Sequence, residues 1–256
     1  MNGWVDISMD NFVTKTLTKL NFKKEPQKQL APHKWTTPIY GYNRQFVLPP
    51  YNTESLDKKD TKYVQQVVGS FLYYTRAIDN TIITAPNEIA LMQAKPTETT
   101  RQKINILLQY LTTYPNTRIR FYASDMILYA DSDTAYLIAD KAKSRIAGYF
   151  YCSNKRTTNP PKPRLNQPIH VECKLLRHVV TSAAEVETAG LFVNGQKVIK
   201  IQQMLNALGH PQTMTPIKTD NATAASFVKD MLKQKRSKAW DMRYHWLSEQ
   251  QTLIIF

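Results

Sequence analysis

The spacing of apolar residues changes near residue 117, and this change limits the folds open to the chain. Between residues 60 and 114 the apolar positions recur every three or four residues, as they do along one face of a helix. After residue 117 apolar and polar residues alternate instead, as they do in strands. The sequence therefore predicts a helical part followed by a part that contains a sheet.

Consecutive strands, followed by alternating helices and strands, are predicted after residue 117. Consecutive strands favour an antiparallel meander, and the later alternation favours parallel strands joined by crossover helices. The expected fold class is α/β, a mixed sheet with helices on its faces. The predicted strands lie at 118–123, 126–133, 145–152, 169–177, 215–220 and 253–256. The predicted helices lie at 183–208, with a break near Asn194-Gly195 left open, at 222–232 and at 239–249.

The part before residue 118 divides into three segments. Residues 1–22 predict a short strand and a helix. Residues 23–59 are rich in proline and predict an extended linker that docks on a surface through Trp35, Tyr40 and Tyr42. Residues 60–117 predict three helices. Their expected signals are an N-cap at Asp60, a start at Thr84-Ala85-Pro86, a cap at Thr97 and a stop at Tyr114-Pro115.

The charge of the chain favours a polyanionic partner. Lys plus Arg is 34 and Asp plus Glu is 20, a formal net charge of +14. Nucleic acid is the common partner of such a chain, although the same charge can serve solubility alone. No apolar run has the roughly 18 residues of a membrane helix, and the start has no signal pattern, so no membrane partner is expected. The two cysteines fit free thiols in a reducing, intracellular compartment.

Carboxylates are scarce, and several fall where predicted strands end and a helix begins. Asp131 and Asp133 end one strand, Asp220 ends another, and Glu185 and Glu187 open the long helix. Clustered carboxylates repel one another unless a divalent cation such as Mg²⁺ offsets their charge. A basic chain with an acidic pocket suits a metal-dependent nuclease. Helix caps and solvated turns remain the alternative explanation for these residues.

Several motifs in the same order resemble the copia-type LTR retrotransposon polyproteins. Two upstream stretches, VDISMDNFVTKTL (5–17) and QQVVGSFLYYTRAID (65–79), resemble the end of the reverse-transcriptase palm, the thumb and the connection. The downstream stretches resemble the ribonuclease H domain: SDTAY (132–136), KSRIAGYFY (143–151), TSAAEVETAGL (181–191), TDNATA (219–224) and QKRSKAWDMRYHWL (234–247). The resemblance implies a ribonuclease H-like mixed five-stranded sheet over 118–256, its last strand incomplete.

The resemblance also implies a site and a reaction. The catalytic, metal-holding residues fall on Asp133, Glu187 and Asp220, with Asp131 as a neighbour open to misassignment. Glu185 lies about 200° around the helix from Glu187, so both cannot face one site. The implied cofactor is a pair of Mg²⁺ ions, with Mn²⁺ as a substitute. The implied activity is endonucleolytic hydrolysis of the RNA strand of RNA–DNA hybrids.

The sequence departs from the family pattern at the fourth aspartate. The family places it in a motif like A-D-x-F-T-K, and no such motif occurs here. Asp241 is a weaker substitute, since the family motif has an aspartate there without a metal role. We expect a chain truncated at both ends, with weakened hydrolysis. The alternatives are an inactive remnant that binds nucleic acid, or a subunit completed by another chain. No Y-x-D-D sequence occurs, so no polymerase activity is expected.

The remaining predictions concern partners and location. A basic run before the last predicted helix is expected to contact nucleic-acid phosphates: Lys233, Lys235, Arg236 and Lys238. His245 is a candidate proton shuttle, with helix packing as the alternative. The resemblance implies an RNA–DNA hybrid and the rest of the reverse transcriptase or polyprotein as partners. It implies an intracellular location, either cytoplasmic in a virus-like particle or nuclear.

Overall fold

The computed structural model describes residues 3–34, 53–139, 143–155, 165–177, 180, 182–220, 246–247, 249–250 and 254–255. The chain divides into two compact units. One comprises residues 5–120, and the other comprises residues 121–256 with residues 1–4. The division falls within a two-stranded sheet formed by β1 (Trp4–Ser8) and β2 (Arg118–Tyr122). The strand predicted at 118–123 therefore pairs with β1 and lies outside the larger sheet.

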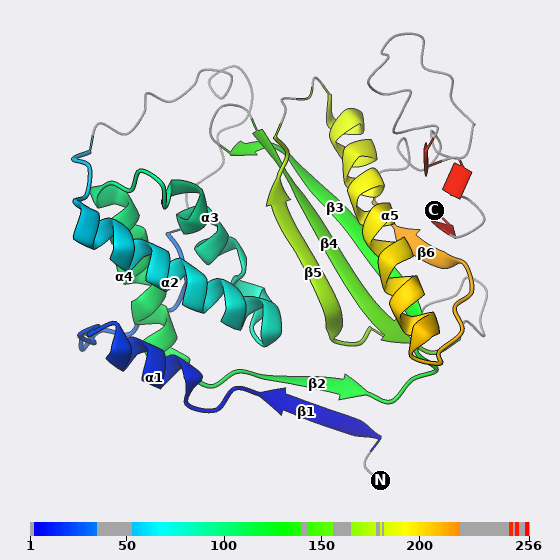
Figure 1. Ribbon diagram of the computed structural model, residues 1–256, viewed down its shortest axis with the longest axis horizontal. Helices are drawn as coiled ribbons and strands as arrows, with labels where there is room; N and C mark the ends of the chain where they lie inside the picture. The colour runs from blue at the N-terminus through cyan, green and yellow to red at the C-terminus, as the bar shows by residue number, and fades with distance from the viewer. Residues whose placement is uncertain are drawn as a thin grey trace. The chain divides into compact units, whose positions relative to one another are not determined.

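The unit of residues 5–120 is helical, as the three- and four-residue spacing predicts. Its elements are α1 (Phe12–Lys19), α2 (Lys58–Ala77), the short 3₁₀ helix η2 (Asn80–Ile82), α3 (Thr84–Met92) and α4 (Glu98–Thr113) (Figure 1). One face of each long helix is buried in a shared apolar core. That core includes Val13, Leu17, Val64, Val67, Phe71, Ile104, Leu107 and Leu111. Burial of this face stabilises helices that would be marginal alone.

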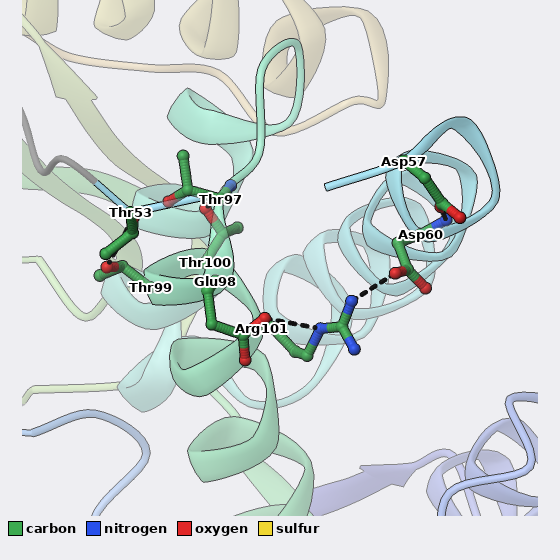
Figure 2. A network of polar contacts seen from close by, with 8 residues as sticks. All are labelled: Thr53, Asp57, Asp60, Thr97, Glu98, Thr99, Thr100 and Arg101. Carbon is green, nitrogen blue, oxygen red and sulfur yellow. Dashed lines mark hydrogen bonds and ion pairs between the residues drawn. The ribbon is translucent and has the colours of Figure 1, made fainter. Parts of the chain in front are cut away.

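Helix α2 begins earlier than predicted. Asp57 is its N-cap, and the Asp57 carboxylate accepts a hydrogen bond from the Asp60 backbone N–H at 2.7 Å. The prediction of Asp60 as the cap is therefore wrong, because Asp57 satisfies the free N–H groups one turn upstream. Asp60 instead forms an ion pair with Arg101 of α4, whose Nε lies 3.3 Å from Glu98 Oε2 (Figure 2). The three side chains are 37–46% exposed, so these pairs contribute little stability.

The other predicted helix boundaries of this unit are confirmed. Helix α3 begins at Thr84, with Pro86 in its first turn, and α4 ends at Thr113, before Tyr114-Pro115. Thr97 is the N-cap residue of α4, and its backbone N–H donates to the Thr100 hydroxyl at 3.1 Å. This hydrogen bond satisfies the Thr97 backbone N–H, which the helix itself leaves unpaired.

The start of the proline-rich linker docks on α4, as predicted. The buried Gln109 side chain accepts a hydrogen bond from the Glu25 backbone N–H at 3.1 Å and donates to the Glu25 carbonyl at 3.0 Å. It also donates to the Gln27 carbonyl at 2.5 Å. One side chain thus supplies the partners that a neighbouring strand would give an extended segment. The aromatic residues from which docking was predicted, Trp35, Tyr40 and Tyr42, lie outside the described residues.

The second unit contains a mixed five-stranded sheet in the order β5-β4-β3-β6-β7. Its strands are β3 (Ile127–Ala139), β4 (Lys143–Ser153), β5 (Pro168–Leu175), β6 (Thr215–Lys218) and β7 (Ile254–Ile255). Strands β3, β4 and β5 form an antiparallel meander, while β6 pairs parallel with both β3 and β7. This arrangement confirms the α/β fold class and the mixed five-stranded sheet that the resemblance implies. Strand β3 runs past its predicted end at 133, because its hairpin pairing with β4 continues to Ala139 and Lys143 through an irregular step.

Helix α5 (Ala183–Ala207) packs on β3 and β4 without a break (Figure 1). Leu191, Val198 and Leu205 are buried with apolar residues of the strands. The break considered near Asn194-Gly195 is absent. A Cβ on Gly195 would lie 3.2 Å from Trp246, so the glycine allows a close contact inside a continuous helix. The helix ends as predicted before Gly209, whose φ of +87° favours glycine.

None of the helices in the described residues is long and apolar enough to cross a membrane. The helices predicted at 222–232 and 239–249 fall largely outside the described part of the chain.

Candidate metal centre

Three carboxylates from separate elements of the sheet unit meet at one place. Asp133 comes from β3, Glu187 from the N-terminal part of α5, and Asp220 from the segment after β6. One carboxylate oxygen of each lies within 4.8 Å of the others. These are the three residues on which the resemblance places the catalytic site.

The parallel register of two strands accounts for the first pair. Asp131 of β3 is paired with Lys218 of β6. Asp133 and Asp220 each follow by two residues, so the same register carries both toward one end of the strand pair. The parallel pairing of β3 and β6 therefore explains why the two aspartates are close, although they are far apart in sequence.

The start of α5 places the third carboxylate. The Ser182 hydroxyl accepts a hydrogen bond from the Glu185 backbone N–H at 3.2 Å and thereby fixes the first turn. Glu187, in the next turn, is only 7% exposed. Glu185 lies about 200° away around the helix and is not part of the cluster, in agreement with the angular argument.

The electrostatics of the cluster favour a bound cation. Burial raises the pKa of Glu187, and the charges of Asp220 and Asp133 raise it further, while a hydrogen bond from Thr134 opposes both. Glu187 Oε2 is buried and has no hydrogen-bond partner within the described residues. A buried acceptor beside two further carboxylates is costly in the absence of positive charge. The donor set consists of carboxylate oxygens, the ligands that Mg²⁺ prefers, so these residues fit a divalent metal.

Asp131 has a different environment, although it is only two residues from Asp133. It is half-buried beside Lys218 and Tyr149, its partners on β6 and β4. Burial raises the pKa of Asp131, and Lys218 partly offsets this effect. The Asp133 carboxylate instead accepts a hydrogen bond from the Thr134 backbone N–H at 2.8 Å. The alternating pattern of a strand gives two aspartates at positions i and i+2 the same expected side, so it cannot tell which one belongs to the site. Their tertiary contacts differ, and these contacts distinguish them.

The other predicted site residues lie outside the described part of the chain. They are Lys233, Lys235, Arg236, Lys238, Asp241 and His245. Sequence reasoning also missed the tight packing of α5 on the strands next to Asp133. The residues that could have indicated this packing are Gly190, one turn after Glu187, and the pair Asn194-Gly195, which the sequence alone leaves open as a helix break.

Comparisons with known proteins agree with these motifs. No family model matches the chain. It is 23% identical over 246 residues to the retrovirus-related Pol polyprotein from transposon TNT 1-94 of Nicotiana tabacum. The match covers 95% of the chain but only 17% of that relative.

Two solved structures are similar to about half of the chain. One is the N-terminal RNase H domain of rv2228c from Mycobacterium tuberculosis, with a TM-score of 0.36 and 9% identity, covering 51% of this chain and 80% of that one. The other is LC11-RNase H1 in complex with an RNA/DNA hybrid, with a TM-score of 0.33 and 11% identity, covering 51% and 81%. By its match along nearly its whole length, the chain is thus similar to a retrotransposon polyprotein, as its motifs indicated.

Proposed function

We propose that the chain comprises the end of the reverse transcriptase and the ribonuclease H domain of a copia-type retrotransposon polyprotein, and that it hydrolyses the RNA strand of RNA–DNA hybrids. The observation that carries the proposal is the convergence of Asp133, Glu187 and Asp220 on one partly buried place. A chain with net charge +14 has no evident structural need for such a cluster. A metal site on a basic protein serves phosphodiester chemistry well, because the basic surface attracts the polyanion that the metal site cuts.

The three carboxylates have distinct parts in this proposal. Glu187 is buried and supplies a fixed, dehydrated oxygen, while the more exposed Asp133 and Asp220 lie on the side open to substrate. Together they hold two Mg²⁺ ions, or Mn²⁺ in their place, which when bound activate water and stabilise the leaving oxygen. The products are a 3′-hydroxyl and a 5′-phosphate. Duplex shape and the 2′-hydroxyl select the substrate rather than base sequence.

The remaining assignments rest on the resemblance. Residues 1–22 and 60–117 correspond to the palm end, thumb and connection of the reverse transcriptase, 23–59 to a linker, and 118–256 to the ribonuclease H-like domain. The hybrid backbone contacts Lys233, Lys235, Arg236 and Lys238. Asp241 is the weaker candidate for a further metal ligand, and His245 is the candidate proton shuttle. The rest of the polyprotein is a partner, inside the cell in the cytoplasm or nucleus.

A second candidate function is nucleic-acid binding without cleavage. It is favoured by the net charge of +14, which attracts a polyanion whether or not the chain cleaves it. In this alternative the chain grips hybrids through its positive charge, or another chain completes the site.

The test is cleavage of an end-labelled RNA–DNA hybrid by the full chain with Mg²⁺, beside paired variants. Asp133→Asn and Glu187→Gln are expected to abolish cleavage, whereas Asp131→Asn and Glu185→Gln, with the same charge changes nearby, keep it. Cleavage that survives Asp133→Asn would refute the assignment. Salt-sensitive hybrid binding with no cleavage by the unaltered chain would support the binding function instead.

A further inference from the structure

The buried side chain of Asn194 ties α5 to the strand that carries Asp133. Asn194 has no exposed surface and lies seven residues after Glu187. Seven residues are almost two full helical turns, so the two side chains leave the helix in nearly the same direction, about 10 Å apart along its axis. Glu187 and Asn194 thus share the helix face that meets the sheet.

The hydrogen bonds of Asn194 end on the immediate surroundings of Asp133. Its Nδ2 donates to the Ser132 hydroxyl at 2.8 Å and to the Ala147 carbonyl at 2.9 Å. Ser132 precedes Asp133 in β3, and Ala147 is the residue of β4 paired with Asp133. A single amide group therefore holds α5 at both strands beside this carboxylate.

Two glycines allow the close approach that these bonds need. A Cβ on Gly148, the partner of Ser132 in β4, would lie 2.4 Å from Asn194 Oδ1. A Cβ on Gly190, one turn after Glu187, would lie 2.5 Å from the Thr134 methyl group. Helix α5 is thus fixed against the residues on either side of Asp133, with no space to slide or rotate.

The amide has a cost that apolar packing would avoid. Asn194 Oδ1 is buried and accepts no hydrogen bond within the described residues. A buried unsatisfied acceptor is unfavourable, and a leucine of similar size would bury no polar atom. The three carboxylates nearby repel one another and tend to drive α5 and β3 apart when no cation is bound.

From these observations we infer that Asn194 is a positioning residue, which holds Glu187 beside Asp133 so that the site is preformed for a divalent cation. The inference rests on the proposed metal site and adds the residue that sets its geometry. Without the Asn194 hydrogen bonds the carboxylates separate, and part of the binding free energy of the cation is then spent on bringing them together again. Residues that orient metal ligands typically change metal affinity 10- to 100-fold when replaced.

The test compares Mn²⁺ affinity with thermal stability in the full chain, by calorimetric titration and melting. Asn194→Leu is expected to weaken Mn²⁺ binding about tenfold. Gln202→Leu is the matched control, because Gln202 is a buried amide of the same helix that donates to Thr215 Oγ1 at 2.7 Å and the Thr213 carbonyl at 3.3 Å. Gln202→Leu should leave Mn²⁺ affinity unchanged, and the melting curves show that both variants are folded.

The outcomes separate the inference from the proposed function. Wild-type binding that Asp133→Asn removes establishes the metal site. With that site established, unchanged affinity in Asn194→Leu, or an equal loss in Gln202→Leu, overturns the positioning role. If Asn194→Leu does not fold, the milder Ser132→Ala decides: it should weaken Mn²⁺ binding severalfold, and unchanged affinity would overturn the role. An unaltered chain that binds no Mn²⁺ refutes both the metal site and the inference.

Discussion

Replacing Glu187 by Gln should stabilise the metal-free protein while removing its metal site. The ligand oxygens of Glu187, Asp133 and Asp220 lie within 4.8 Å of one another. At that distance two unit charges repel by roughly 3.5 kcal/mol at an effective dielectric constant of about 20. Asp133 and Asp220 are exposed, so solvent screens much of this repulsion. We therefore expect a gain of about 1–2 kcal/mol in the free energy of unfolding.

The measurement is urea unfolding at neutral pH, with EDTA and then with millimolar Mg²⁺. In EDTA the variant should have the larger free energy of unfolding, and in a parallel thermal melt its melting temperature should be higher by about 2–8 °C. Mg²⁺ at ten times its dissociation constant should add about 1.4 kcal/mol to the wild type and nothing to the variant.

Glu185→Gln is the control for this prediction. It makes the same charge change on the same helix, but it removes a negative charge from the first turn, so stability should fall by about 0.5 kcal/mol. The reasoning is refuted if Glu187→Gln destabilises the protein in EDTA, or if Mg²⁺ stabilises wild type and variant equally.

Two further predictions concern pH. The Mn²⁺ affinity of the wild type should fall as the pH is lowered through the pKa of Glu187, which is raised above its ordinary 4.5, because protons compete with the cation for the ligand oxygen. Calorimetric titration at several pH values measures this. An Mn²⁺ affinity that does not change down to pH 4.5 would contradict the prediction. The neighbouring His170, then Lys174 of β5 and Lys197 of α5, lower the pKa of Glu172 on β5 to about 2. A change from 4.5 to about 2 corresponds to at most about 3 kcal/mol, and we expect about 1–2 kcal/mol because the partner side chains are 36–44% exposed. A lowered carboxyl pKa stabilises the protein above pH 4.5, and this contribution is lost as the pH falls toward 2. Glu172→Gln should therefore lower the free energy of unfolding at pH 7 and change it little at pH 2, as measured by urea unfolding. An equal loss at both pH values would contradict the prediction.

Local sequence signals predicted the elements of the chain well where neighbours along the chain decide the structure. The helix start at Thr84, the cap at Thr97 and the stop before Gly209 depend on residues within one turn. The prediction of Asp60 as a cap was wrong because Asp57, equally suitable, lies one turn earlier, and sequence alone does not rank two acceptable caps. The extension of β3 beyond residue 133 was missed because pairing with β4, a tertiary contact, sets the length of a strand.

By itself the sequence determined the order of elements, the mixed sheet and the short set of acidic residues from which a site could be built. Periodicity and charge are properties of the chain alone, so they needed no coordinates. The resemblance placed the site on Asp133, but the alternating pattern alone gives Asp131 and Asp133 the same status. The structure brings Asp133 beside Glu187 and Asp220, and it leaves Asp131 in a different environment. Only the structure revealed Asn194 as a buried tie between α5 and the strands, because a hydrogen bond between residues 62 apart in sequence leaves no local signal.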